Sequence, residues 1–194
     1  SFAAGALNLA SGGTFTNEQN LSGFDYAIEG SGGKVLTVTN NATLSANKFD
    51  GMWNCCFATT TFINNGSITA VRNGIGQFGG SSISFTNNAS INVTGTTSGS
   101  GVGFYSYGTG TYVNTGTITG REGMILVGGN HVIRNTGVIT ASVVDLNISS
   151  GTVTSLTNSE GGNNVLTYSG KVPTNYYIII SSLNNYGKLS VTNP

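Results

Sequence analysis

Short runs of alternating apolar and polar residues recur along the chain, and each run ends at an asparagine. Val35-Leu36-Thr37-Val38-Thr39-Asn40 and Ser82-Ile83-Ser84-Phe85-Thr86-Asn87 are two clear copies. Such alternation predicts strands that bury one face. Apolar residues do not recur at the three- to four-residue spacing of a helix, so we expect almost no α-helix.

Seven asparagines, roughly 23 residues apart, mark one position in successive copies of a repeated unit. They are Asn17, Asn40, Asn64, Asn87, Asn114, Asn135 and Asn158. Repetition at such a period is typical of a solenoid, in which each coil buries its apolar face against the next. We expect the asparagine amides to form a structural ladder that hydrogen-bonds from coil to coil and holds the corner.

A third strand completes each unit and begins after a glycine, as in Gly51-Met52-Trp53-Asn54. Three short strands and three turns per unit predict an all-β fold, a right-handed single-stranded parallel β-helix of about seven coils. The repeat decays after Asn158, so we expect coils over residues 1–164 and a strand-rich capping or bracing segment of the same domain over residues 165–194. The longer interval from Asn87 to Asn114 predicts a projecting turn around residues 94–101.

Composition argues against several classes of function. Only 7% of the residues are charged and the formal net charge is zero, whereas phosphate recognition needs clustered Lys and Arg, so we expect no nucleic-acid partner. No apolar run approaches the roughly 20 residues of a membrane-spanning helix. The sequence begins at Ser1 without a methionine, as a mature exported product does, and we expect export.

Five charged residues fall in one turn region of the coils: Asp25, Asp50, Arg72, Glu122 and Asp145. Asp25 and Asp50 lie on adjacent coils, so a glycosidase pair of carboxylates, about 5 to 9.5 Å apart, is one hypothesis. A ladder of solvated turn charges is the other. We favour the ladder and expect no enzyme activity, because no further catalytic group clusters with these residues.

The remaining candidates for chemistry are one histidine and two cysteines. His131 has neither a cysteine nor an acidic neighbour, so we interpret it as a surface or partly buried residue and expect no metal and no cofactor. Cys55 and Cys56 are adjacent, which fits neither a zinc site nor a redox CxxC motif. Two free thiols, a vicinal disulfide and a crosslink to another chain are all open, and free thiols are favoured.

Aromatic residues indicate a partner-facing surface. If Met52 and Val102 point inward, alternation turns the next residues outward. The predicted outward stripe is Trp53, Phe57, Phe78, Tyr105 and Tyr107. Such a stripe indicates a partner, a sugar or a covering segment of the same chain, for which the apolar run Tyr176 to Ile180 is a candidate. The opposite parity would place these rings in the core.

The repeated NNGSIT, NTGTIT and NTGVIT segments, with the closing stretch YYIIISSLNNYGKLSVTNP, resemble the passenger regions of bacterial autotransporter-type surface proteins. The copies cover most of residues 17–158. This resemblance implies display outside the cell, attachment to or secretion from the outer membrane, and a role in adhesion, aggregation or surface-layer building.

Together these features predict a non-catalytic structural protein of the bacterial cell surface. Its expected partners are copies of itself, stacked or laterally associated as a filament or a surface layer. One alternative is an adhesin that binds surface glycans through the aromatic stripe. The second alternative is a polysaccharide lyase or hydrolase centred on Asp25 and Asp50.

Overall fold

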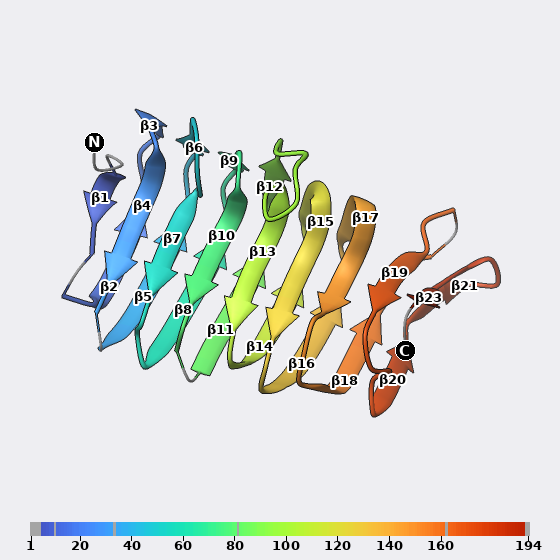
Figure 1. Cartoon of the computed structure of the whole chain (residues 1–194). Helices are drawn as coiled ribbons and strands as arrows, with labels where there is room; N and C mark the ends of the chain where they lie inside the picture. The colour runs from blue at the N-terminus through green and yellow to red at the C-terminus, as the bar shows by residue number, and fades with distance from the viewer. Residues whose placement is uncertain (1–4, 10, 33, 81, 162, 193–194) are drawn as a thin grey trace.

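The computed structural model describes residues 5–9, 11–32, 34–80, 82–161 and 163–192. These residues form a β-solenoid of parallel strands, with about eight turns that repeat every ~23 residues (Figure 1). The predicted parallel β-helix is therefore confirmed, with one turn more than the seven asparagines mark. The additional turn escapes the count because Ile178, not an asparagine, pairs with Asn158.

The strands that lead into the asparagine corner form an eight-stranded parallel sheet. They are β2 (Gly13–Asn17), β5 (Val35–Asn40), β8 (Thr59–Asn64), β11 (Ser82–Asn87), β14 (Thr109–Asn114), β16 (Asn130–Asn135), β18 (Thr152–Asn158) and β20 (Asn175–Ile178). Alternation sets their orientation: in β11 the side chains of Ile83, Phe85 and Asn87 are buried, whereas Ser82 and Ser84 are exposed.

The second and third strands of each turn belong to one 13-stranded sheet that covers the other two faces. The second strands are β3 (Leu21–Phe24), β6 (Leu44–Ala46), β9 (Ile68–Ala70) and β12 (Ser90–Val93). The third strands are β1 (Gly5–Asn8), β4 (Tyr26–Ser31), β7 (Met52–Cys55), β10 (Asn73–Phe78), β13 (Val102–Tyr107), β19 (Leu166–Ser169) and β23 (Leu189–Thr192).

Two turns depart from the predicted three short strands. In β15 (Thr117–Val127) and β17 (Val138–Ile148) the second and third strands run on as one strand, and their pairing shifts register between Gly120 and Glu122. These long strands join the two faces into a single sheet.

The core consists of columns of apolar side chains that stack in register along the solenoid axis. In the eight-stranded sheet the column is Val38, Phe62, Phe85, Tyr112, Ile133 and Leu156. On the third strands it is Ile28, Met52, Ile75, Phe104, Met124, Leu146 and Tyr168. All of these side chains are buried, so each turn is stabilised chiefly by contact with its neighbours.

The predicted asparagine ladder is present along the corner. From Asn17 to Asn158, each side-chain Nδ2 donates to the Oδ1 of the next asparagine, at N–O distances of 2.8 to 3.3 Å. The amides also hold the turn, because Asn87 Nδ2 donates to the carbonyl oxygen of Ala89 at 3.0 Å. All seven side chains are buried, so the corner is ordered without charge.

A second ladder, not predicted from the sequence, lies on the outside of the same corner. Side-chain hydrogen bonds of 2.8 to 3.0 Å join the residues that follow the buried asparagines. They are Glu18, Asn41, Asn65, Asn88 and Thr115. The repeated Asn-Asn pairs were the available signal.

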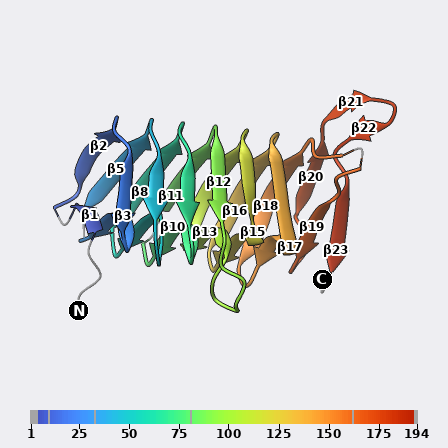
Figure 2. The ribbon, with the colours of Figure 1, turned by 90° about the horizontal axis from the view of Figure 1, so that it is seen from above.

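Parallel strand pairing continues beyond residue 164, into the segment predicted to cap or brace the coils. The strands β19 and β20 pair in parallel with β17 and β18, and β23 pairs with β19. A short antiparallel hairpin, β21 (Ile180–Ser182) with β22 (Asn185–Tyr186), projects at this end (Figure 2). The predicted covering run, Tyr176 to Ile180, is thus divided between β20 of the stack and the start of β21, and it does not cover the aromatic stripe.

The longer interval between Asn87 and Asn114 forms a loop that projects after β12, as predicted (Figure 2). Its base is fixed by hydrogen bonds from Gly95 N to the carbonyl oxygen of Val71 and from Gly101 N to that of Arg72, at 3.0 and 2.7 Å. Over the described ranges, no helix is long and apolar enough to cross a membrane.

Candidate binding surface

Aromatic side chains lie on the outer face of the third strands. Pairing aligns Trp53 on β7 with Gly76 on β10 and Tyr105 on β13. The preceding residues Met52 and Phe104 are buried, so alternation directs Trp53 and Tyr105 outward, as predicted.

Six rings follow one another along this face, each with its centroid 5.0 to 6.3 Å from the next. In order, this aromatic row is Phe49, Tyr26, Trp53, Phe78, Tyr105 and Tyr107. Tyr107 is exposed and the other five side chains are half-buried. The rings are therefore held in place by packing while part of each remains open to solvent.

Gly76 makes room for the centre of the row. A Cβ atom there would lie 2.7 Å from Asp50 Oδ2 and 2.8 Å from the ring of Phe78. The Phe78 ring thus occupies the space above the glycine, where it stacks on Tyr105 at an interplanar angle of 25°.

Phe57 does not belong to the row, and its predicted outward orientation is wrong. The strand β7 ends at Cys55, and Cys56 has a φ of 71°, so the alternation stops before residue 57. Phe57 is only 1% exposed. Its ring lies beneath Gly12 and Gly30, 3.3 Å from where a Cβ of either would be.

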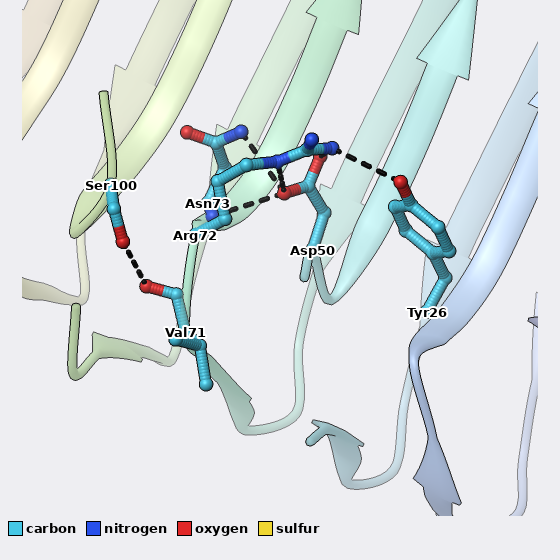
Figure 3. A network of polar contacts seen from close by, with 6 residues as sticks. All are labelled: Tyr26, Asp50, Val71, Arg72, Asn73 and Ser100. Carbon is cyan, nitrogen blue, oxygen red and sulfur yellow. Dashed lines mark hydrogen bonds and ion pairs between the residues drawn. The ribbon is translucent and has the colours of Figure 1, made fainter. Parts of the chain in front are cut away.

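Arg72 and Asp50 form an ion pair beside the row (Figure 3). Arg72 donates from Nε to Oδ1 at 2.8 Å and from Nη2 to Oδ2 at 2.9 Å. The carboxylate, which is 0% exposed, also accepts from the backbone N and the side-chain Nδ2 of Asn73, at 3.1 and 3.0 Å. Nη2 reaches the hydroxyl of Tyr26 at 3.4 Å. This bidentate geometry fixes the plane of the guanidinium.

Aromatic rings surround the guanidinium. Its carbon lies 5.6, 5.2 and 5.8 Å from the ring centroids of Tyr26, Phe49 and Phe78. Burial raises the pKa of Asp50, although the hydrogen bonds from Arg72 oppose the change, and the hydrogen bond to Asp50 raises the pKa of Arg72. Within the described residues, Nη1 of Arg72 has no hydrogen-bond partner, so it can donate to a ligand.

A pocket of about 250 Å³ opens next to this guanidinium. It is lined by Arg72, Asn73, Phe78, Gly99, Val102, Tyr105 and Ile125. The projecting loop supplies Gly99, and Ser100 Oγ anchors that loop by donating to the carbonyl oxygen of Val71 at 3.1 Å (Figure 3). The pocket thus combines aromatic rings with a cationic hydrogen-bond donor.

A larger hollow of about 370 Å³ lies nearby but offers less specific chemistry. It is lined by residues 93–96, 119–121 and 142–143, which include no aromatic ring. Its one charged group, Arg121, is paired with Glu122. We therefore take the smaller pocket as the candidate site.

Apart from Asp50 and Arg72, the predicted turn charges do not join the site. Three of the five predicted charges are buried, although solvated charges were expected. Asp50, Glu122 and Asp145 are buried. Asp145 accepts hydrogen bonds from Ala141 N at 2.8 Å and from the backbone N and hydroxyl of Thr167 at 2.8 and 2.7 Å. These carboxylates are buried because neighbouring turns supply donors for them.

The side chain of Asp25 does not join the ion pair of Asp50 and Arg72. Among the described residues, its side chain has no hydrogen bond or ion pair, while Asp50 is fully enclosed by Arg72 and Asn73. The glycosidase hypothesis requires two carboxylates that face solvent together, and Asp25 and Asp50 do not meet this requirement.

Cys55 and Cys56 form a vicinal disulfide with an S–S distance of 2.07 Å, so the favoured prediction of free thiols is wrong. Cys56 is exposed, and Cys55 pairs in register with Phe78. The disulfide therefore lies beside the centre of the aromatic row.

His131 is fully buried, contrary to its predicted surface or partly buried position. It lies on β16, with its ring centroid 5.6 Å from that of Tyr112. Neither ring nitrogen has a hydrogen-bond partner in the described part of the chain, and burial lowers its pKa. The residue is part of the packed interior.

Tyr26, Phe49 and the position of Arg72 among the rings were missed at the sequence level. The sequence held a usable signal. Ile28 pairs with Met52 in the core, Tyr26 lies two residues before Ile28, and Asp50 lies two residues before Met52. Counting back from the core column would have placed the tyrosine next to the carboxylate of the following turn.

Comparison with protein-family models, with curated proteins and with solved structures gives no match.

Proposed function

We propose that this chain is a non-catalytic structural protein of the bacterial cell surface that self-associates through one end of its solenoid. The observation that carries the proposal is a set of exposed apolar side chains on the last strands and in the turn between β21 and β22. This C-terminal apolar patch consists of Tyr177, Ile178, Ile180, Leu183, Tyr186 and Val191. Leu183 is 95% exposed and Ile180 is 73% exposed. Surfaces of this kind mark protein contacts.

A second copy of the chain is the partner whose geometry fits this end. Within the described residues, β2 and β20 are the two edges of the eight-stranded parallel sheet. Edge strands present unpaired backbone groups. The β2 edge is flanked by a pocket of about 290 Å³ lined in part by Leu7, Phe15 and Leu21. Stacking the C-terminal apolar patch on this end continues the strands in one direction, and such a heterologous contact builds filaments.

Export to the cell surface is supported by the disulfide and by the sequence. Disulfides form in oxidising compartments, and Cys55–Cys56 is one. The resemblance of the asparagine repeats to autotransporter passengers favours a protein attached to or secreted from the outer membrane.

The absence of catalysis is proposed because two of the candidate carboxylates, Asp50 and Asp145, already have structural partners. Asp50 accepts from Arg72 and Asn73, and Asp145 accepts from Ala141 and Thr167. A general acid or base must instead reach its substrate.

Sedimentation velocity over a range of protein concentrations tests the self-association. We expect the wild type to form larger species as concentration rises, and the double variant Ile180→Lys/Leu183→Lys to remain monomeric. Val143→Lys is the matched control, because Val143 is 56% exposed but lies on β17, outside the C-terminal apolar patch. A wild type that stays monomeric throughout, or a double variant that associates as the wild type does, would contradict the proposal.

A further inference from the structure

The aromatic row and the pocket beside Arg72 are distinct from the surface proposed for self-association. Trp53, Phe78 and Tyr105 lie on β7, β10 and β13, in the middle of the solenoid. The segment that could have covered them, Tyr176 to Ile180, lies instead in β20 of the other sheet and at the start of β21. The row is therefore open to a ligand.

We propose that the pocket beside Arg72 binds a pyranose ring of a neutral glycan, whose chain continues along the aromatic row. A pyranose presents C–H groups on its faces and hydroxyl groups around its edge. Flat aromatic rings with polar atoms at their margin match that shape. Phe78 and Tyr105 supply stacked rings 5.2 Å apart, and Arg72 Nη1 supplies a donor at the margin.

The direction of the row favours a chain over a single sugar. Trp53, Phe78 and Tyr105 come from three consecutive strands of one sheet, and such strands lie about 4.8 Å apart. The hydroxyl groups of Tyr105 and Tyr107, joined by a hydrogen bond of 2.9 Å, lie at one end of the row and can bond further hydroxyl groups. Consecutive sugar units can thus meet consecutive rings.

Local charge favours a neutral ligand over an anionic one. The positive charge of Arg72 is offset by Asp50, with which it forms two hydrogen bonds. A further acid, Glu29, flanks the surface, since it pairs in register with Trp53, whereas the buried Glu122 is offset by its ion pair with Arg121. A polyanionic glycan would meet these carboxylates without a compensating cationic cluster.

Trp53 is the single tryptophan of the chain, so its fluorescence reports directly on this surface. The experiment titrates the Ile180→Lys/Leu183→Lys variant with neutral hexasaccharides of glucose, mannose, galactose and xylose, and with hexagalacturonate. Using this variant separates glycan binding from self-association. We expect at least one neutral hexasaccharide to change the emission saturably, with an affinity that varies less than about twofold when salt is raised about tenfold.

Variants of the row show whether the signal comes from the proposed site. Tyr105→Leu keeps an apolar side chain but removes the ring, and we expect the affinity to fall about tenfold or more. Tyr177→Ala, which removes an exposed aromatic residue of β20, should leave the affinity unchanged. Circular dichroism verifies that each variant is folded.

Three results would overturn the proposal: no response to any neutral hexasaccharide, salt-sensitive binding of hexagalacturonate alone, or unchanged affinity in folded Tyr105→Leu. The first would leave the self-association proposal intact, because that proposal is tested by sedimentation.

Discussion

At the scale of the residue, order at the main corner depends on a neutral side chain that both donates and accepts. Asn87 accepts from Asn64 Nδ2 and donates to Asn114 Oδ1, each at 2.8 Å, and it is fully buried. An aspartate could not donate and an alanine could do neither. Asparagine is therefore suited to repeat through the stack without accumulating charge.

Replacing Asn87 with alanine should lower the free energy of unfolding by about 3 kcal/mol, because it leaves buried amide groups of Asn64 and Asn114 unsatisfied. Chemical denaturation measures the change.

Asn88→Ala is the matched control, since Asn88 belongs to the exposed outer ladder next to Asn87. Its cost should stay below about 1 kcal/mol. Equal losses for the two variants, or no loss for Asn87→Ala, would show that the buried ladder does not stabilise the corner.

A buried acid ends the ladder and makes stability depend on pH. Glu160 accepts from Asn135 Nδ2 at 2.7 Å and from Ile139 N at 3.2 Å. Burial raises the pKa of Glu160 from 4.5 to about 7, and Asp145 adds to the increase. Between these values the unfolded chain releases a proton that the folded chain keeps. The contribution of protonated Glu160 to the free energy of unfolding is thus fully present below pH 4.5, and it is lost as the pH rises to about 7.

Glu160→Gln should remove this loss. Relative to the wild type, the variant should gain about 2 kcal/mol when the pH is raised from 4.5 to 8, after allowance for solvent screening. Urea denaturation of both proteins at the two pH values measures the gain. The contribution of His131 to the pH dependence cancels in this comparison, because both proteins contain it. An equal stability difference at the two pH values would argue against a raised pKa.

At the scale of the element, the projecting loop is separable from the coil that carries it. Residues 96–99 are exposed, and the interval from Asn87 to Asn114 is 27 residues, so deleting four restores an interval of 23. The deletion also removes Gly99, which lines the candidate pocket.

We expect the variant lacking residues 96–99 to keep the thermal stability of the wild type within a few degrees and to bind the neutral hexasaccharide several-fold more weakly. Thermal denaturation and the Trp53 titration measure the two effects. Unchanged affinity would remove the loop from the site, and a large loss of stability would mean that the loop is part of the coil's packing.

Most strands could be predicted because alternation and the asparagine spacing carry the information locally. The fusion of two strands in β15 and β17 could not, since Gly120 gives no sign that the corner beside it opens. Phe57 was misplaced because alternation holds only within a strand, and β7 ends at Cys55. The eighth turn was missed because Ile178 replaces the asparagine.

The candidate site was only partly predictable for a related reason. Trp53, Phe78 and Tyr105 follow from strand alternation. The partnership of Arg72, Asp50 and Tyr26 joins three turns through side chains at a corner, where the spacing varies by a residue or two. Side-chain geometry was needed to choose between a solvated ladder and a buried ion pair.

At the scale of the whole molecule, the parallel stack leaves a repeating surface with little charge. The formal net charge is zero, so copies of the chain do not repel one another strongly. The C-terminal apolar patch should then associate through burial of apolar surface, which salt does not weaken. The glycan site on the side of the solenoid would remain accessible in such an assembly, because the contact lies at its end.

Electron microscopy of the purified protein across a concentration series is the most direct test of this architecture. We expect elongated particles that lengthen with concentration along the solenoid axis, and we expect them to be lost in Ile180→Lys/Leu183→Lys. Monodisperse particles of single-chain size at every concentration would contradict it.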